Sequence, residues 1–239
     1  MSQYEVRGAG KAFKRGPIVI NALHGVGLSI EPGEFVALEG PSGSGKTTLL
    51  QLLGALDRPS SGRVFFEGRD LADLRDRELA ELRLRSFGFV FQQFNLIPTL
   101  TALENVQAKL APAGLSTAGA RRRAEALLAE VGLADRGTHL PSHLSGGEQQ
   151  RVSIARALSV EPRVILADEP TGNLDSTTGT EIIEILASLA ADRGATVVVA
   201  THDSGLAGRA QRRLGMRDGK LVAAAHPADG DVVGAAAGS

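Results

Sequence analysis

Residues 40–47 read Gly40-Pro-Ser-Gly-Ser-Gly-Lys-Thr47, between a short apolar run and a leucine-rich stretch. They match the pattern G-x-x-x-x-G-K-[ST], whose glycines let backbone N–H groups turn inward around phosphate oxygens. A helix that begins here adds the positive end of its dipole. A plain glycine turn in front of a helix is the alternative, and it explains neither the lysine nor the hydroxyl. The residues expected to bind a nucleotide's phosphates are Gly40, Pro41, Ser42, Gly43, Ser44, Gly45, Lys46, Thr47 and Thr48.

The segments around this loop predict the fold class. Phe35–Leu38, Arg163–Ala167 and Thr196–Ala200 are short apolar runs typical of buried strands, whereas Lys46–Leu56 and Ser176–Ala191 show helical spacing. Strands that read as continuous apolar runs and alternate with helices predict an α/β protein with a mainly parallel sheet. The expected architecture is a P-loop NTPase core.

Two additions to that core are expected. Ala22–Ile30 alternates at period two and Arg63–Glu67 also reads as a strand, which predicts an N-terminal antiparallel β subdomain. From Thr101 to about Leu158 the pattern is helical, which predicts an inserted α-helical subdomain at about residues 93–160. The predicted domain covers residues 1–222, and the Ala/Gly-rich residues 223–239 are expected to be a disordered tail.

Smaller features complete the expected structure. Leu71–Arg85 reads as a charged amphipathic helix, and Phe87, Phe89 and Phe91 at period two indicate a strand. Arg217-Asp-Gly-Lys220 is typical of a hairpin turn. Two arginine groups are interpreted as solvated helix faces: Arg121–Arg123 at the start of one helix, and Arg209 to Arg213 at the end of another.

Composition excludes several classes of function. The chain has 239 residues, 26 basic against 27 acidic, and 43% hydrophobic residues, which is globular composition with a net charge of -1. A near-neutral chain with 4% aromatics is unlike a nucleic-acid binder. Without cysteine there is no disulfide and no thiolate metal site. The first ten residues do not read as a signal peptide, and no apolar run approaches the roughly 20 residues of a spanning helix, so a cytoplasmic chain is expected.

A second chemical signal lies at the end of the apolar run that begins at Arg163. The run ends in Asp168-Glu169, which places both acids at the carboxyl edge of the predicted sheet, where ligands of α/β proteins bind. Asp168 is expected to hold Mg²⁺, directly or through water, and Glu169 to orient and deprotonate the attacking water. Adjacent acids at a strand end are ordinarily only solvated; the phosphate loop favours the functional interpretation.

A third signal is Leu144-Ser-Gly-Gly-Glu-Gln-Gln-Arg151, at the start of a predicted helix. Ser145, Gly146 and Gly147 offer a hydroxyl and open N–H groups at a helix N-terminus, which is a second anion-binding device. A serine N-cap followed by two glycines is the structural alternative. One nucleotide does not need two phosphate cradles in one chain, but the duplication makes sense if the second cradle faces another subunit's nucleotide.

With these motifs in hand, residues 4–220 resemble the nucleotide-binding subunit of ATP-binding-cassette (ABC) transporters. GPSGSGKT resembles the Walker A loop, LSGGEQQR the signature motif and ILADE the Walker B strand. Phe91-Gln-Gln93 resembles the Q-loop, Asn173-Leu-Asp175 the D-loop and Thr201-His-Asp203 the switch-histidine segment. LLGALDRPSSG and FQQFNLIPTLTALENV further resemble the lipoprotein-release and macrolide-export subfamily.

The resemblance implies roles for further residues. Gln92 is expected to touch Mg²⁺ or the water, and His202 to contact the γ-phosphate and fix the geometry of Glu169. Asp175, Ser145, Gly146 and Gly147 are expected to act on the nucleotide of a partner chain. Phe13 stands thirty-three residues before Lys46, where relatives usually carry a tyrosine that stacks on adenine.

The same resemblance implies the biological unit. Two chains are expected to form a homodimer that sandwiches ATP and Mg²⁺, and separate transmembrane permease subunits are expected to hold it at the inner face of the cell membrane. An exporter ATPase is the implied function. An ATPase that regulates a membrane partner without transport is the alternative, and a P-loop kinase is a third that leaves LSGGEQQR unexplained.

Overall fold

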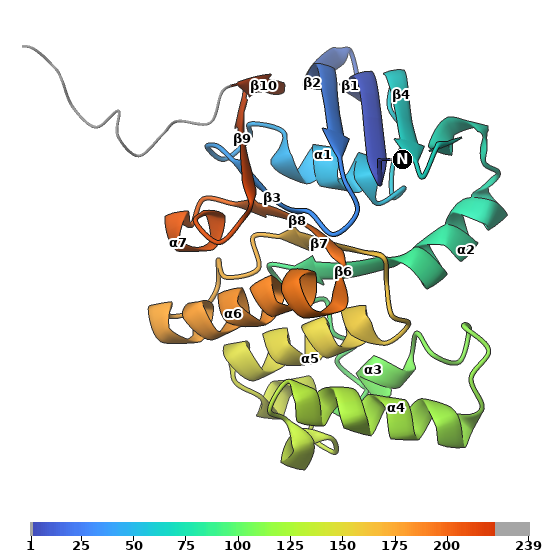
Figure 1. The fold of residues 1–239 in the computed structure, drawn as a ribbon, viewed down its shortest axis with the longest axis vertical. Coiled ribbons are helices and arrows are strands. Elements are labelled where there is room, and N and C mark those ends of the chain that lie inside the picture. The colour runs from blue at the N-terminus through green and yellow to red at the C-terminus, as the bar shows by residue number, and fades with distance from the viewer. Residues whose placement is uncertain (1, 223–239) are drawn as a thin grey trace, which may run out of the picture.

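The computed structural model describes residues 2–222 and contains two sheets and seven α-helices within that range (Figure 1). The strands are β1 (Tyr4–Arg15), β2 (Ile18–Ile30), β3 (Phe35–Glu39), β4 (Ser61–Phe66), β5 (Arg69–Asp70), β6 (Phe87–Phe91), β7 (Val164–Asp168), β8 (Thr196–Thr201), β9 (Arg212–Arg217) and β10 (Lys220–Val222). The helices are α1 (Lys46–Leu53), α2 (Asp76–Ser86), α3 (Ala102–Gln107), α4 (Thr117–Glu130), α5 (Gly146–Leu158), α6 (Ser176–Arg193) and α7 (Ser204–Ala207). Three 3₁₀ turns span Leu71–Asp73, Ala134–Arg136 and Pro141–His143.

The larger sheet has the order β10-β9-β3-β8-β7-β6. The pairs β9–β3, β3–β8, β8–β7 and β7–β6 are parallel, and only β10 runs antiparallel to its neighbour. The predicted mainly parallel sheet of a P-loop core is therefore confirmed. Because parallel neighbours end at the same edge, β3, β7 and β8 deliver the segments that follow them to one side of the molecule.

Side chains on β8 show why this sheet is apolar on both faces. Val197 and Val199 belong to a buried cluster with helices α3 to α6, whereas Val198 and Ala200 belong to a second cluster with α1 and the smaller sheet. Successive strand residues point to opposite faces, so covering both faces requires a continuous apolar run. In Figure 1, α1 and the smaller sheet lie above β3, β8, β7 and β6, and α5 and α6 lie below these strands.

The smaller sheet has the order β2-β1-β4-β5, and all its pairs are antiparallel. Tyr4 on β1 is fully buried, and its hydroxyl donates to the carbonyl of Leu53 at the end of α1, 3.0 Å away. That bond ties the sheet to the helix that follows the phosphate loop. The predicted antiparallel β subdomain is confirmed, and it includes the long strand β1, which no single pattern in the sequence indicated.

Helices α3, α4 and α5 form the predicted helical layer, with α5 also packed against β6. Figure 1 places α3 and α4 on the far side of α5 from the sheet.

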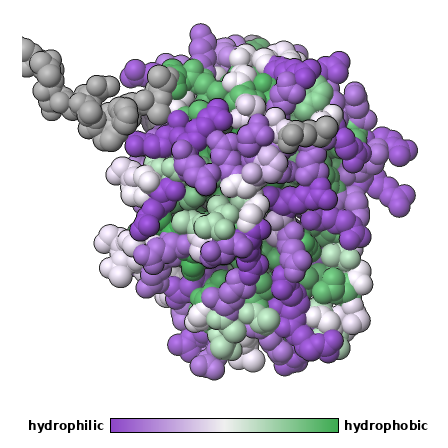
Figure 2. Space-filling view, viewed as in Figure 1, coloured by the Kyte–Doolittle hydropathy of each residue, from purple (hydrophilic) through white to green (hydrophobic). Residues whose placement is uncertain are grey.

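Residues 223–239, for which a disordered tail was predicted, lie outside the described residues. No helix within residues 2–222 is long and apolar enough to cross a membrane. Hydrophilic residues cover most of the face seen in Figure 2, with smaller apolar patches between them.

Two predicted helices have different bounds. The Leu71–Arg85 helix is a 3₁₀ turn followed by α2, because Glu78 accepts a hydrogen bond from the Arg75 backbone N–H and so starts a new helix there. The Lys46–Leu56 helix ends at Leu53, since Gly54 follows as the C-cap and Ala55 adopts a left-handed conformation with φ 51°.

The interpretation of Arg209 to Arg213 as the solvated end of a helix is wrong. Helix α7 ends at Ala207, and Arg212 and Arg213 lie on β9. The Arg213 guanidinium forms an ion pair with the Glu39 carboxylate on β3, at 2.6 and 2.9 Å, which adds a side-chain contact to the backbone pairing of β9 with β3. The predicted hairpin turn at 217–220 is confirmed between β9 and β10, where Asp218 and Gly219 both have positive φ.

Candidate nucleotide-binding site

The phosphate loop connects β3 to α1, as the sequence predicted. Gly45 has a φ of 104° and is the N-cap of α1, so a residue with a side chain would be strained there. At Gly40 an added Cβ would lie 2.1 Å from the Met216 carbonyl oxygen on β9. These glycines therefore let the loop close tightly against the edge of the sheet. No acidic residue stands in the first turn of α1, which leaves its positive dipole end open to an anion.

Lys46 is held at the floor of the loop. Its ammonium donates to the carbonyl oxygens of Gly40 (2.7 Å) and Pro41 (3.2 Å) and lies 3.5 Å from the Glu169 carboxylate. Its side chain is only 7% exposed. The cation is thus buried and balanced by one carboxylate, in a position from which it can exchange carbonyl partners for phosphate oxygens.

A cleft of about 720 Å³ opens beside the loop. It has the size of a small-molecule site. Its lining consists of Ala22, Ser42, Gly43, Ser44, Gly45, Lys46, Thr47, Thr48, Gln92, Glu169 and His202. The cleft therefore brings together residues predicted to bind phosphate and all three residues predicted to be catalytic, which are Gln92, Glu169 and His202.

Two of the residues predicted to hold Mg²⁺ touch each other. The Thr47 hydroxyl donates to the Asp168 carboxylate over 3.0 Å. Burial raises the pKa of Asp168, although the bond from Thr47 acts in the opposite direction. A hydroxyl, a carboxylate and the Gln92 amide are hard oxygen donors, and Mg²⁺ takes one or two protein oxygens together with substrate phosphates. The donor set fits this metal.

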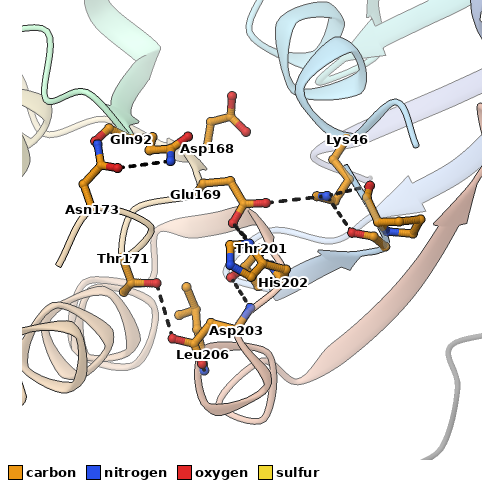
Figure 3. Close-up of polar contacts among 12 residues, drawn as sticks. Lys46, Gln92, Asp168, Glu169, Thr171, Asn173, Thr201, His202, Asp203 and Leu206 are labelled. Atoms are coloured by element: carbon orange, nitrogen blue, oxygen red, sulfur yellow. Dashed lines mark hydrogen bonds and ion pairs between the residues drawn. The ribbon is translucent and has the colours of Figure 1, made fainter. Parts of the chain in front are cut away.

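Glu169 and His202 form the second half of the site (Figure 3). The Glu169 carboxylate lies 2.7 Å from the Nδ1 atom of His202 and 3.3 Å from its backbone N–H. Glu169 also has a φ of 46°, a conformation that is uncommon outside glycine and costs about 1–3 kcal/mol. Such strain is tolerated where surrounding contacts fix the residue, and here it turns the carboxylate away from the line of β7 toward His202 and Lys46 (Figure 3).

The segment after Glu169 contributes two polar contacts that the sequence did not identify. Asn173 exchanges two hydrogen bonds with Gln92, and the Thr171 hydroxyl donates to the Asp203 carboxylate over 3.3 Å. Both pairs join residues far apart in the chain, as Figure 3 shows. The sequence singled out Asn173 only as part of the D-loop resemblance, because side-chain amides carry no pattern of their own.

The residues predicted to act on the nucleotide of a partner chain lie outside the lining of this cleft. Among residues 2–222, Ser145, Gly146, Gly147 and Asp175 are not part of its lining. Ser145 is the N-cap of α5: its hydroxyl accepts from the Glu148 backbone N–H over 3.2 Å. Both interpretations of this motif, helix cap and second anion cradle, are compatible with that geometry.

Asp175 likewise serves as a helix cap. Its carboxylate accepts hydrogen bonds from the backbone N–H groups of Thr177 (3.1 Å) and Thr178 (3.0 Å) at the start of α6, and from the Thr178 hydroxyl (2.7 Å). These bonds, those of Thr178 foremost, hold the pKa of Asp175 below its usual value. These contacts are all within one chain, and the role of Asp175 across a dimer interface stays a prediction.

Gly147 has a packing role that can be tested. An added Cβ would lie 2.3 Å from the Cγ2 atom of Thr178, whose hydroxyl is fixed on Asp175. We expect Gly147→Ala to lower the free energy of unfolding by about 1–3 kcal/mol, the usual cost of overpacking. Thr178→Ser deletes the clashing methyl group and keeps the hydroxyl, so the double variant should recover most of the loss in thermal melts. A single variant as stable as the parent would contradict this contact.

Phe13 lies on β1, outside the lining of the cleft, and is 38% exposed. Its cross-strand partner is Ile20, and the Lys11 ammonium lies 5.1 Å from its ring centroid. Because the ring is exposed, one of its faces can stack on a base, and the stacking of Phe13 on adenine stays a prediction.

Fold and site together define a P-loop nucleoside triphosphatase: a mainly parallel sheet with the phosphate loop, Asp168 and Glu169 at one edge. A family model described as "ABC transporter" matches residues 23–172, more than half of the chain. The chain belongs to the ABC transporter family.

Relatives agree with the predicted subfamily resemblance. The chain is 53% identical over 223 residues to a macrolide export ATP-binding/permease protein of Nitrobacter winogradskyi, covering 93% of this chain but 34% of that protein. It is 49% identical over 221 residues to a lipoprotein-releasing system ATP-binding protein of Syntrophus aciditrophicus, covering 92% and 99% of the two chains. The chain thus spans about a third of the first relative and nearly all of the second.

Solved structures confirm the fold. A dimeric ATP-binding cassette in a post-hydrolysis state, bound to ADP and Pi, superposes with a TM-score of 0.86 at 45% identity. The superposition covers 91% of this chain and 96% of that one. The structure of cbiO1 from Clostridium perfringens, part of the ABC transporter complex cbiONQ, superposes with a TM-score of 0.82 at 29% identity and covers 92% and 87% of the two chains.

Proposed function

We propose that this chain hydrolyses ATP as the motor subunit of an ABC membrane complex of the exporter type. One observation carries the proposal: Lys46, Glu169, His202 and Gln92 line one cleft beside the phosphate loop, while the signature loop is outside it. A cleft with a phosphate cradle and a polarising carboxylate suits hydrolysis of a nucleoside triphosphate.

The phosphate loop binds and orients the nucleotide. Backbone N–H groups of residues 42–48 and the dipole of α1 neutralise the β- and γ-phosphates, and Lys46 adds a full positive charge beside them. Thr47, Asp168 and Gln92 would hold Mg²⁺, which supplies neutralisation of charge on the phosphate oxygens when it is bound. Phe13 would stack on the base.

Glu169 accepts the proton of the attacking water and directs its oxygen toward the γ-phosphate. His202 donates to the Glu169 carboxylate, and this contact fixes the rotamer of the base. Because the side chain of His202 is 70% exposed at the mouth of the cleft, it is also free to reach the γ-phosphate.

Two copies complete the site. Ser145, Gly146 and Gly147 present a hydroxyl and N–H groups at the N-terminus of α5, away from their own chain's cleft, and would face the γ-phosphate held by a partner chain. The dimeric, ADP-bound cassette with a TM-score of 0.86 supports such a homodimer. ATP then bridges two chains, and its cleavage to ADP and phosphate removes the bridge.

The membrane coupling rests on the relatives. Proteins named for macrolide export and lipoprotein release share about half of this sequence, which supports an exporter or extractor of lipids, lipoproteins, peptides or drugs. The chain would sit on the cytoplasmic face of the membrane through separate permease subunits. Regulation of a membrane partner without transport is the alternative, and neither relative's name favours it.

Hydrolysis by a shared site predicts a characteristic concentration dependence. Phosphate release in the presence of Mg²⁺ should rise with about the square of protein concentration at low concentration, because two chains form each site. EDTA should abolish it, and Lys46→Ala provides the blank. A rate strictly proportional to concentration, from a chain that sedimentation shows to be monomeric throughout, would contradict the proposal.

A further inference from the structure

The D-loop side chain Asn173 makes a reciprocal contact with Gln92 that orients one specific atom. The Nδ2 amide of Asn173 donates to the main-chain carbonyl of Gln92 over 2.9 Å, and the Nε2 amide of Gln92 donates to Oδ1 of Asn173 over 3.3 Å. Figure 3 shows the two amides facing each other beside Asp168.

Donor and acceptor chemistry permits only one arrangement of this pair. A main-chain carbonyl can only accept, so Asn173 must present its NH₂ group to it. The amide oxygen of Asn173 then faces Gln92, and Gln92 must donate a hydrogen bond to it from its own NH₂ group. The remaining group of Gln92, its oxygen Oε1, is left free to turn toward the cleft. A hard cation binds that oxygen and rejects the NH₂ group.

The backbone that carries Asn173 is itself fixed. The Gly172 N–H donates to the Glu169 carbonyl and the Leu174 N–H to the Thr171 carbonyl, both over 3.0 Å. The Thr171 side chain, in a residue only 8% exposed, is bound to Asp203. Asn173 is thus held by two turns and a side-chain bond to the segment that carries His202.

Gly172 allows the close approach of the two segments. A Cβ at this position would lie 2.9 Å from Nε2 of Gln92 and 3.3 Å from its Cδ. The backbone of Gly172 does not have a positive φ, so alanine fits its conformation and only the contact with Gln92 opposes it. The absence of a side chain at Gly172 therefore leaves room for the Gln92 amide beside the D-loop.

We propose that Asn173 is a positioning residue for the metal: it locks the Gln92 amide so that Oε1, and not Nε2, faces the Mg²⁺ that accompanies ATP. This inference rests on the proposed function. It also gives the D-loop a task within its own chain, separate from the predicted task of Asp175 across the dimer. Any movement of the D-loop changes the orientation of a metal ligand.

The test measures how strongly Mg²⁺ tightens ATP binding. Calorimetric titrations with ATP, in Mg²⁺ and in EDTA, are made on the full chain carrying Glu169→Gln to suppress turnover. Adding Asn173→Leu, which has a similar size and no hydrogen-bonding group, should reduce the tightening by Mg²⁺ about tenfold, the lower range for loss of a ligand's orienting partner. ATP affinity in EDTA should stay within about twofold of the parent, which also shows that the fold is intact.

Two further variants separate orientation from a general structural effect. Gly172→Ala should displace the Gln92 amide and weaken the metal effect while Asn173 is still present. Gln92→Glu offers two equivalent oxygens and needs no orientation, so Asn173→Leu should change the metal effect by less than about twofold in that background. Asn21→Leu, an exposed asparagine on β2, is the matched control.

The possible results are distinct. If ATP binding by the Glu169→Gln chain does not depend on Mg²⁺, the proposed function and the inference are both overturned. If its ATP binding does depend on Mg²⁺, but adding Asn173→Leu or Gly172→Ala does not change that dependence, the inference alone is overturned. An equal loss from Asn173→Leu in the Gln92 and Gln92→Glu backgrounds also overturns it, because the residue would then act by a route other than the amide.

Discussion

Glu169→Gln should lower the rate of ATP hydrolysis by about 10²–10⁴-fold, the range for loss of a general base, while ATP binding is retained. Glutamine keeps the shape of the side chain and can still accept a hydrogen bond from His202, which lies 2.7 Å from the carboxylate. It cannot take a proton from water. It also removes a negative charge 3.5 Å from Lys46, which reduces the repulsion of an incoming phosphate. Binding should therefore be equal or tighter.

The measurement combines phosphate release with gel filtration in ATP and Mg²⁺. Because the variant binds ATP but does not cleave it, a dimer should accumulate that the parent shows only transiently. Glu184→Gln, which removes the same charge from an exposed position on α6, is the control and should behave as the parent. Near-normal hydrolysis by Glu169→Gln would remove this residue from the role of base.

The parts of the site that follow a strand could be predicted from the sequence. The phosphate loop and Asp168-Glu169 each stand directly after an apolar run, and parallel strands end at a common edge, so adjacency in the chain translates into adjacency in space. The backbone conformation of Glu169 had no such signal. Its φ of 46° depends on the turn that follows β7, which only the folded chain determines.

Contacts between loops were not predictable in the same way. The bonds between Asn173 and Gln92 join residues 81 positions apart, and each side chain on its own reads as an ordinary polar surface residue.

The wrong interpretation of Arg212 and Arg213 as part of a helix has a similar origin. Their sequence shows no strand alternation, and their place on β9 is set by pairing with β3 and by the carboxylate of Glu39. Tertiary pairing outweighs local pattern at such positions.

Ser145→Arg should abolish ATP hydrolysis and leave the binding of ATP to a single chain unchanged. Ser145 is not part of the cleft that Lys46 and Glu169 line, so a nucleotide can still enter there. In the proposed dimer, however, the guanidinium would occupy the place of the hydroxyl and N–H groups that we propose face the partner chain's γ-phosphate. Loss of such preorganised donors costs about 10²–10³-fold in rate, and the added bulk obstructs closure as well.

The substitution also removes the N-cap of α5, which costs about 1 kcal/mol, so a matched control is needed. Ser116→Arg makes the same change at the N-cap of α4, where the Ser116 hydroxyl accepts from the Gly119 N–H over the same 3.2 Å as the Ser145 bond to Glu148. Both variants should lose similar stability in thermal melts, but only Ser145→Arg should lose turnover and the ATP-dependent dimer. If ATP binding collapses in Ser145→Arg and not in Ser116→Arg, the signature loop supports its own chain's cleft, and a site shared between two copies is not required to explain the motif.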